Sequence, residues 1–113
     1  MSKYDAFDPQ GPLAIIAAAT VAPTPVQVSA TSFASLEIIN AGAVDVFLCH
    51  APTSAGAAAI AALGIPTVGS PKAGVVPIPV GSDKVYSLRS DEFYTAITAS
   101  STANVYLLAG RGV

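Results

Sequence analysis

Few residues of this chain have side chains that could carry out chemistry, and their spacing argues against a shared site. The chain has one cysteine and one histidine, which are adjacent as Cys49 and His50. Neighbouring residues of a strand point to opposite faces, so these side chains are not expected to meet at one metal ion. A zinc site also needs about three or four ligands. We therefore expect no metal site, and we place His50 at the end of a strand beside a loop.

Carboxylates are the next candidates, because paired carboxyl groups can act as general acid and general base. Asp91 and Glu92 are adjacent in the sequence, and neighbours of this kind at a turn are expected to be solvated rather than catalytic. Asp45 is expected on a strand, where it could pair with a cross-strand cation. These carboxylates therefore favour structural roles.

Motifs for phosphate binding and for nucleophilic catalysis are missing from the sequence. Residues 69–74 read Gly-Ser-Pro-Lys-Ala-Gly and lack the order Gly-x-x-x-x-Gly-Lys-Ser/Thr of a phosphate-binding loop. The chain has no Gly-x-Ser-x-Gly motif and no Ser/His/Asp arrangement in a strand-to-helix context. The sequence therefore predicts a protein that is not an enzyme and binds no cofactor.

The composition indicates a single domain with an apolar surface. A chain of 113 residues is long enough for one core. Only 11% of the residues are charged and 52% are hydrophobic, whereas a dispersed monomer needs a surface with about 25% charged residues or more. Part of the surface is therefore expected to be hidden in an assembly. The formal net charge is −2 and the five Lys and Arg residues are scattered, which argues against nucleic acid as a partner.

The sequence carries no clear signal for secretion or for a membrane. Its single cysteine excludes an intrachain disulfide, which favours folding in the cytosol. The apolar stretch at 13–22 is about half as long as a helix that spans a bilayer. Asp5 and Asp8, with Lys3 as the only side-chain cation before this stretch, do not fit a secretory leader. We expect neither a signal peptide nor a membrane partner.

The first residues are predicted to form an arm that precedes the domain. Pro9, Gly11 and Pro12 oppose regular structure, so we expect an arm at 1–12 and a single domain at 13–113. Tyr4 and Phe7 allow two interpretations of the arm. It is a frayed terminus, or its two aromatic rings anchor it on a neighbouring subunit.

Short apolar runs between turn residues predict an all-β fold. The run at 13–20 is apolar enough to be a strand or a helical turn, and we favour the strand. Segments 36–40 and 44–49 flank Asn40 and Gly42, which predicts a hairpin. From Val75 onwards, breaks at Pro79–Asp83, Ser90–Glu92 and Ser100–Thr102 predict a meander of antiparallel strands.

Several predicted strands are apolar on both faces and therefore need a cover on each side. Phe47 and Cys49 alternate with apolar residues in one strand, and Tyr94 and Tyr106 lie in strands of the same kind. The Ala-rich segment from Ser54 to Gly64 could be the cover, as a short helix at 55–63 or as an irregular loop. We expect an antiparallel β-sandwich or a small jelly-roll-like barrel whose outer sheet meets another protein. The candidate contact residues are Tyr4, Phe7, Phe47, Tyr94 and Tyr106.

Four stretches carry a resemblance to a known group of proteins. They are Asn40–Gly42 with Val46-Phe47-Leu48, Pro79–Ser82 with Val85–Leu88, Phe93–Ala99 with Ala103–Tyr106, and the closing Gly110-Arg111-Gly112. Over residues 36–113 the sequence resembles small virion structural proteins of tailed bacteriophages. The resemblance carries over no catalytic residues.

This resemblance implies a β-sandwich that is made in the host bacterial cytoplasm and coats the capsid surface of the virion as a decoration, or cement, protein. Its partners would be the major capsid protein and further copies of itself, often in a trimer. The resemblance also allows a place in a head fibre or in the tail. A soluble carbohydrate-binding module is the alternative from another functional class.

Overall fold

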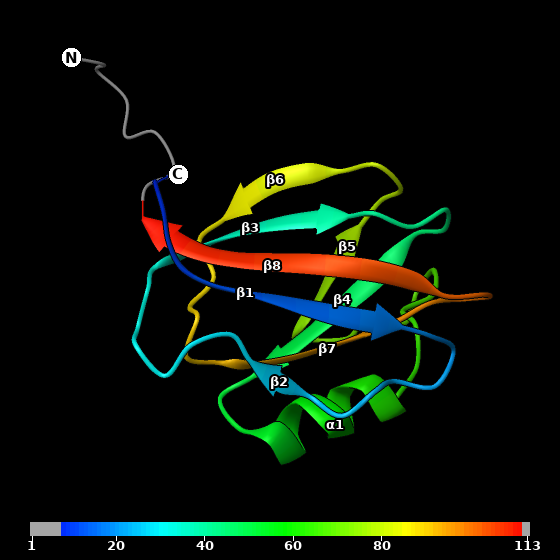
Figure 1. Cartoon of the computed structure of the whole chain (residues 1–113). Coiled ribbons are helices and arrows are strands. Elements are labelled where there is room, and N and C mark those ends of the chain that lie inside the picture. Colours follow the sequence, from blue (N-terminus) through cyan, green and yellow to red (C-terminus); the bar gives the residue numbers. More distant parts are fainter. Residues whose placement is uncertain (1–7, 112–113) are drawn as a thin grey trace.

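A computed structural model describes residues 8–111, which form two four-stranded antiparallel sheets packed face to face (Figure 1). The first sheet has the strand order β1-β8-β3-β6, and the second has the order β2-β7-β4-β5. The strands are β1 (Asp8–Ala18), β2 (Val26–Gln27), β3 (Ser35–Asn40), β4 (Val46–Ala51), β5 (Val75–Ile78), β6 (Asp83–Tyr86), β7 (Phe93–Ile97) and β8 (Ala103–Arg111). The predicted all-β sandwich is confirmed.

Successive strands alternate between the two sheets, except that β4 and β5 pair with each other. Eight strands wound in this order form a jelly roll. Two local predictions are therefore wrong: β3 and β4 lie in different sheets and form no hairpin, and the strands from Val75 onwards form no meander. Turn residues mark where a chain reverses, but they do not decide which sheet the next strand joins.

The core lies between the sheets and is built from the alternate residues of each strand. Leu36, Ile38 and Leu107 of the first sheet and Leu48 and Ile78 of the second are fully buried there. Such a core supplies most of the stability, at roughly 25 cal/mol per Å² of apolar surface removed from water.

Tyr94 also belongs to this core. The residue is fully buried, and its hydroxyl donates a hydrogen bond to the carbonyl oxygen of Arg89 at 2.6 Å. Burial, followed by the nearby charges of Glu92 and Asp91, raises the pKa of the phenol. The expectation that Tyr94 contacts another protein is wrong, because β7 turns this residue toward the first sheet and not outward.

The strand β1 begins at Asp8, so the expectation that Pro9, Gly11 and Pro12 exclude regular structure is wrong for residues 8–12. β1 lies at the edge of its sheet, where a missing N–H group can face away from the ladder. The register against β8 also shifts between Pro9 and Leu13, which is the irregularity expected of a bulge. Tyr4 and Phe7 of the predicted arm lie outside the described residues.

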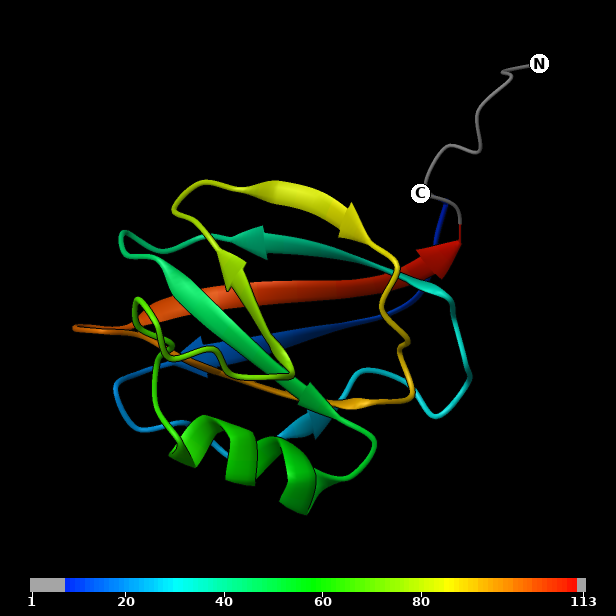
Figure 2. The same cartoon turned by 180° about the vertical axis from the view of Figure 1, so that it is seen from behind.

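The Ala-rich segment forms α1 (Ser54–Ala62), on the side of the second sheet that faces away from the first (Figure 2). Thr53 caps the helix, and its Oγ1 accepts a hydrogen bond from the Gly56 N–H at 3.0 Å. Gly64 ends it with a φ of 83°, which glycine adopts readily. Within residues 8–111, no helix is long and apolar enough to cross a bilayer. Of the two alternatives for this segment, the short helix is the one observed.

Asn40 joins the two sheets where the chain leaves β3. The residue is 2% exposed. Its Nδ2 donates to the carbonyl oxygens of Val44 and Ile78, each at 2.9 Å, and its Oδ1 accepts from the Gly42 N–H at 2.9 Å. Ile78 ends β5 of the second sheet, whereas Asn40 ends β3 of the first. One amide group therefore fixes the turn and holds the sheets together at this corner.

Replacing this amide should destabilise the fold. We expect Asn40→Ala to lower the free energy of unfolding by about 2–4 kcal/mol, because it leaves three backbone groups without their partner. Urea unfolding followed by circular dichroism measures the change. Asn104→Ala is the matched control, since Asn104 is exposed on β8, and it should change stability by less than about 0.5 kcal/mol. Equal losses in both variants would show that Asn40 is an ordinary strand residue.

Candidate interaction surfaces

Cys49 and His50 face opposite sides of β4, as the alternation of a strand predicts. Cys49 is buried and packs with Ala61 and Ile97 under α1. His50 lies on the other side, where its Nδ1 is 2.8 Å from Glu92 Oε1 and its ring centroid is 6.0 Å from that of Tyr94. Within residues 8–111, no three His, Cys, Asp or Glu side chains are grouped so that they could hold a metal ion.

The other carboxylates singled out in the sequence have structural partners. Asp91 accepts two hydrogen bonds from Arg89, from Nε at 3.0 Å and from Nη2 at 2.9 Å, and this contact lowers the pKa of the carboxyl. Glu92 contacts His50, so both neighbours are partly exposed and have structural partners. Asp45 Oδ1 accepts from the Val80 N–H at 2.9 Å. It therefore stabilises the β5–β6 turn, and the expected pairing with a cross-strand cation is wrong.

The outer side of the first sheet, which we call the open face, is an apolar surface. The register places two rows of side chains across its four strands. One row runs Leu13, Leu108, Glu37, Val85, and the next runs Ile15, Tyr106, Ile39, Asp83. Partners in neighbouring strands share a face, and Leu36 and Ile38 point into the core, so both rows point outward.

The described part of the chain leaves the open face uncovered. Leu13 is 53% exposed and Ile15 is 55% exposed, while Tyr106, Leu108 and Ile39 are half-buried by their neighbours in the sheet. Helix α1 lies on the far side of the other sheet. Contiguous apolar surface of this kind marks a contact site, because it costs free energy when it faces water.

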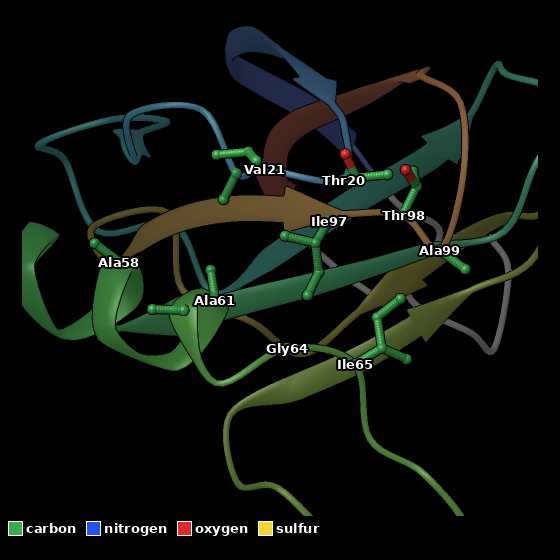
Figure 3. A pocket seen from close by; sticks show the side chains of 11 residues that line it. Thr20, Val21, Ala58, Ala61, Gly64, Ile65, Ile97, Thr98 and Ala99 are labelled. Carbon is green, nitrogen blue, oxygen red and sulfur yellow. The ribbon is translucent and has the colours of Figure 1, made fainter.

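A second apolar feature is a groove of about 530 Å³ beside α1 (Figure 3). Ile97 of β7 lies between Ala61 of the helix and Val21 of the connection from β1 to β2. Its lining contains no charged side chain. Val21 is 81% exposed, and Leu63, at the end of the helix, is 67% exposed. The groove is therefore a second candidate for a contact with protein.

The structure separates the residues that the sequence suggested as contacts. Tyr106 lies on the open face, so its assignment as a contact residue stays a prediction. Phe47 is half-buried on the outer side of the second sheet, against the cluster of Cys49, Ala61 and Ile97. This chain's own helix thus supplies part of the cover that was expected from a partner.

Sequence reasoning missed Leu13 and Ile15 as contact residues. Their run is apolar at every position, so the sequence alone does not tell which residues point outward. The pairing of β1 with β8 decides it, because Leu13 and Ile15 align with Leu108 and Tyr106 on the outer side. Alternation along a strand, once its register is known, is the signal that finds them.

Comparison with known proteins gives no relative for this chain. No protein-family model, no curated protein and no solved structure matches it. A proposal about function therefore depends on the two apolar surfaces and on the chemistry of their residues.

Burial should make Cys49 unreactive while the protein is folded. Loss of hydration raises the pKa of its thiol from 9.0 to about 11, so the nucleophilic thiolate is scarce at pH 8. We expect Ellman's reagent to label Cys49 at least about a hundredfold more slowly in buffer than in denaturant. Because the pKa is raised in the folded state, the stability that the neutral thiol contributes is complete below pH 9 and is lost as the pH rises toward 11.

An exposed cysteine provides the control for this measurement. Ser100→Cys places a thiol in the exposed turn after β7, and this variant should be labelled at its new site without denaturant. If native Cys49 reacts as fast as the new cysteine, α1 does not stay closed over the second sheet.

Proposed function

We propose that this protein is a non-enzymatic structural component of a tailed-bacteriophage virion. In the leading form of the proposal it is a capsid decoration protein, which binds the major capsid protein on the outer shell and stabilises subunit junctions. The observation that carries the proposal is the open face, an apolar sheet surface that the described residues leave uncovered. A building block needs such a surface and needs no reactive groups.

The fold supports this proposal by analogy. Jelly rolls occur in viral capsid domains and in lectins. A fold hosts many functions, so the analogy alone does not assign one. It agrees with the resemblance of residues 36–113 to small virion proteins, and both are consistent with a chain in which only 11% of the residues are charged.

Docking of the open face would stabilise a shell through many small contributions. Each copy would remove the exposed parts of Leu13, Ile15 and their neighbours from water, at roughly 25 cal/mol per Å². A site that bridges two capsid subunits also makes the second contact intramolecular, which multiplies its effect. Modest contacts repeated over a lattice would then resist pressure from within.

Contacts between copies of the chain are the second part of the proposal. We place them at the groove beside α1, where Val21 is exposed. Since its lining carries no charge, two copies can meet there without bringing like charges together. A homo-oligomer such as a trimer would use this groove and keep the open face for the capsid.

Two alternatives predict different outcomes. A tail or head-fibre component would be present in about a dozen copies per particle or fewer. A shell protein would be present in on the order of hundreds of copies, because the copy number follows the symmetry of the structure that the protein joins. A carbohydrate-binding module would bind glycans as an isolated monomer, and jelly rolls are also found in lectins. Quantitative mass spectrometry of particles and a glycan array distinguish these alternatives.

Reducing the apolar character of the open face should weaken binding to the particle. The double variant Leu13→Thr, Ile15→Thr keeps strand-forming side chains and removes apolar surface. We expect it to bind particles that were stripped of this protein at least about tenfold more weakly. A tenfold change in the dissociation constant corresponds to about 1.4 kcal/mol of binding free energy. Co-sedimentation of purified protein with particles measures the affinity.

Val68→Thr is the matched control, because Val68 is fully exposed in the loop between α1 and β5. It should bind as the unmodified protein does. The melting temperatures of all variants should agree, which excludes unfolding as the cause. Unchanged binding of the double variant, with the fold intact, would contradict a contact at the open face.

A further inference from the structure

Two carboxyl groups form a pair at one side of the open face. Glu37 of β3 and Asp83 of β6 lie on the same side of the sheet in neighbouring rows. Hydrogen bonding toward Asp83, followed by burial and then by repulsion from the Asp83 charge, raises the pKa of the Glu37 carboxyl. Two acidic side chains therefore lie close together at a place where residues 8–111 supply no cation.

Apolar side chains border the pair, and no cation of the described residues shares its face. Glu37 lies between Leu108 and Val85 in its row, and Asp83 follows Ile39 and Tyr106 in the next. Lys84 belongs to the side of β6 opposite to the open face, because it aligns with Ile38, which is buried in the core. Within residues 8–111, the other cations are Lys72, Arg89 and Arg111, which lie in loops or at the exposed end of β8.

We propose that the open face recognises a basic protein surface, on which a lysine or arginine surrounded by apolar side chains sits over Glu37 and Asp83. This inference depends on the proposed function, because it names the chemistry of the partner at the same contact. The cation relieves the repulsion between the carboxylates, while Leu13, Ile15 and Tyr106 contribute apolar contact. Charge complementarity of this kind sets the orientation and the rate of association, and a charge pair that becomes buried in the contact also contributes to the affinity.

The charges favour a foreign partner over a second copy placed face to face. Two open faces in contact would bring together four carboxyl groups, two from each copy, with no cation from residues 8–111 to pair with them. Like charges at a contact cost free energy, and burial increases the cost. Nucleic acids and anionic lipid surfaces carry the same sign of charge as the pair, so they are disfavoured as well.

The test removes the two charges and keeps the shapes of the side chains. Glu37→Gln with Asp83→Asn is compared with Asp45→Asn, which removes one carboxylate elsewhere and keeps the oxygen that accepts from Val80. The first probe is the particle, stripped of this protein. We expect the double variant to bind it at least about tenfold more weakly, as for truncation of a buried charge pair. Binding of the unmodified protein should weaken with salt more steeply than that of the double variant.

Carbodiimide cross-linking tests the contact directly. The carbodiimide activates a carboxylate, and a lysine amine in contact with that carboxylate then forms an amide with it. The water lost in this condensation converts the carbodiimide into a urea. Mass spectrometry of cross-linked particles should find amides from Glu37 or Asp83 to a lysine of the shell protein. An arginine partner forms no such amide, so the variant affinities decide that case.

An array of short random peptides is a second probe that needs no particle. The unmodified protein should select peptides in which Lys or Arg alternates with apolar residues. The double variant should lose this selection, and Asp45→Asn should keep it. Selection of uncharged or acidic peptides would overturn the inference.

The outcomes separate this inference from the proposed function. If Leu13→Thr, Ile15→Thr weakens binding to particles and the charge variant does not, the face docks but its partner is not basic. If particles are not bound at all while basic peptides are selected, the virion assignment fails and the basic partner stands. Sedimentation of the protein alone covers the remaining case. A self-association that is lost in Leu13→Thr, Ile15→Thr would make a second copy the occupant and overturn the inference.

Discussion

A β-sheet has two faces, and this chain uses its one described helix to cover the outer face of only one of its two sheets. Under α1, Cys49 and Ile97 of the second sheet form a small core of their own. The open face of the first sheet has no equivalent among residues 8–111. Leu13 and Ile15 on the open face therefore stay exposed.

The fold does not need a partner to be complete. Its core is closed between the sheets, and its buried polar groups are nearly all satisfied within the chain. Asn40 bonds three backbone groups, and Thr95 donates to the carbonyl oxygen of Pro23 at 2.8 Å. Within residues 8–111, Ser82 Oγ is the one buried side-chain polar atom without a hydrogen-bond partner. The open face is therefore available for contact without being required for folding.

Local patterns in the sequence were sufficient for the kind of structure but not for its topology. Alternating apolar residues predicted strands at 36–40 and 93–99, and Ser54 to Gly64 carried the signals of a short helix. The turn at Asn40 and Gly42 was recognised, yet the side chain of Asn40 reaches Ile78, which is 38 positions further along the chain. Such a contact over a long distance in the sequence leaves no local trace, so the hairpin prediction failed.

The candidate surfaces were predictable only in part for the same reason. Tyr106 was identified because aromatic residues in strands that are apolar on both faces need a second cover. Tyr94 has the same pattern, but the pairing of β7 with β4 turns it inward, and the sequence alone could not distinguish the two. Glu37 and Asp83 lie 46 positions apart and meet only because β3 and β6 are neighbours in the sheet.

Footprinting with hydroxyl radicals compares the accessibility of the open face in the free protein and in assembled particles. Oxidation of Tyr106, Leu13 and Ile15 should fall several-fold on assembly, because a bound surface excludes the radical from apolar side chains that are now exposed or half-buried. Val68, which is fully exposed elsewhere, should be oxidised equally in both. Equal oxidation of the three open-face residues in the free and assembled protein would contradict the claim that another protein covers this sheet.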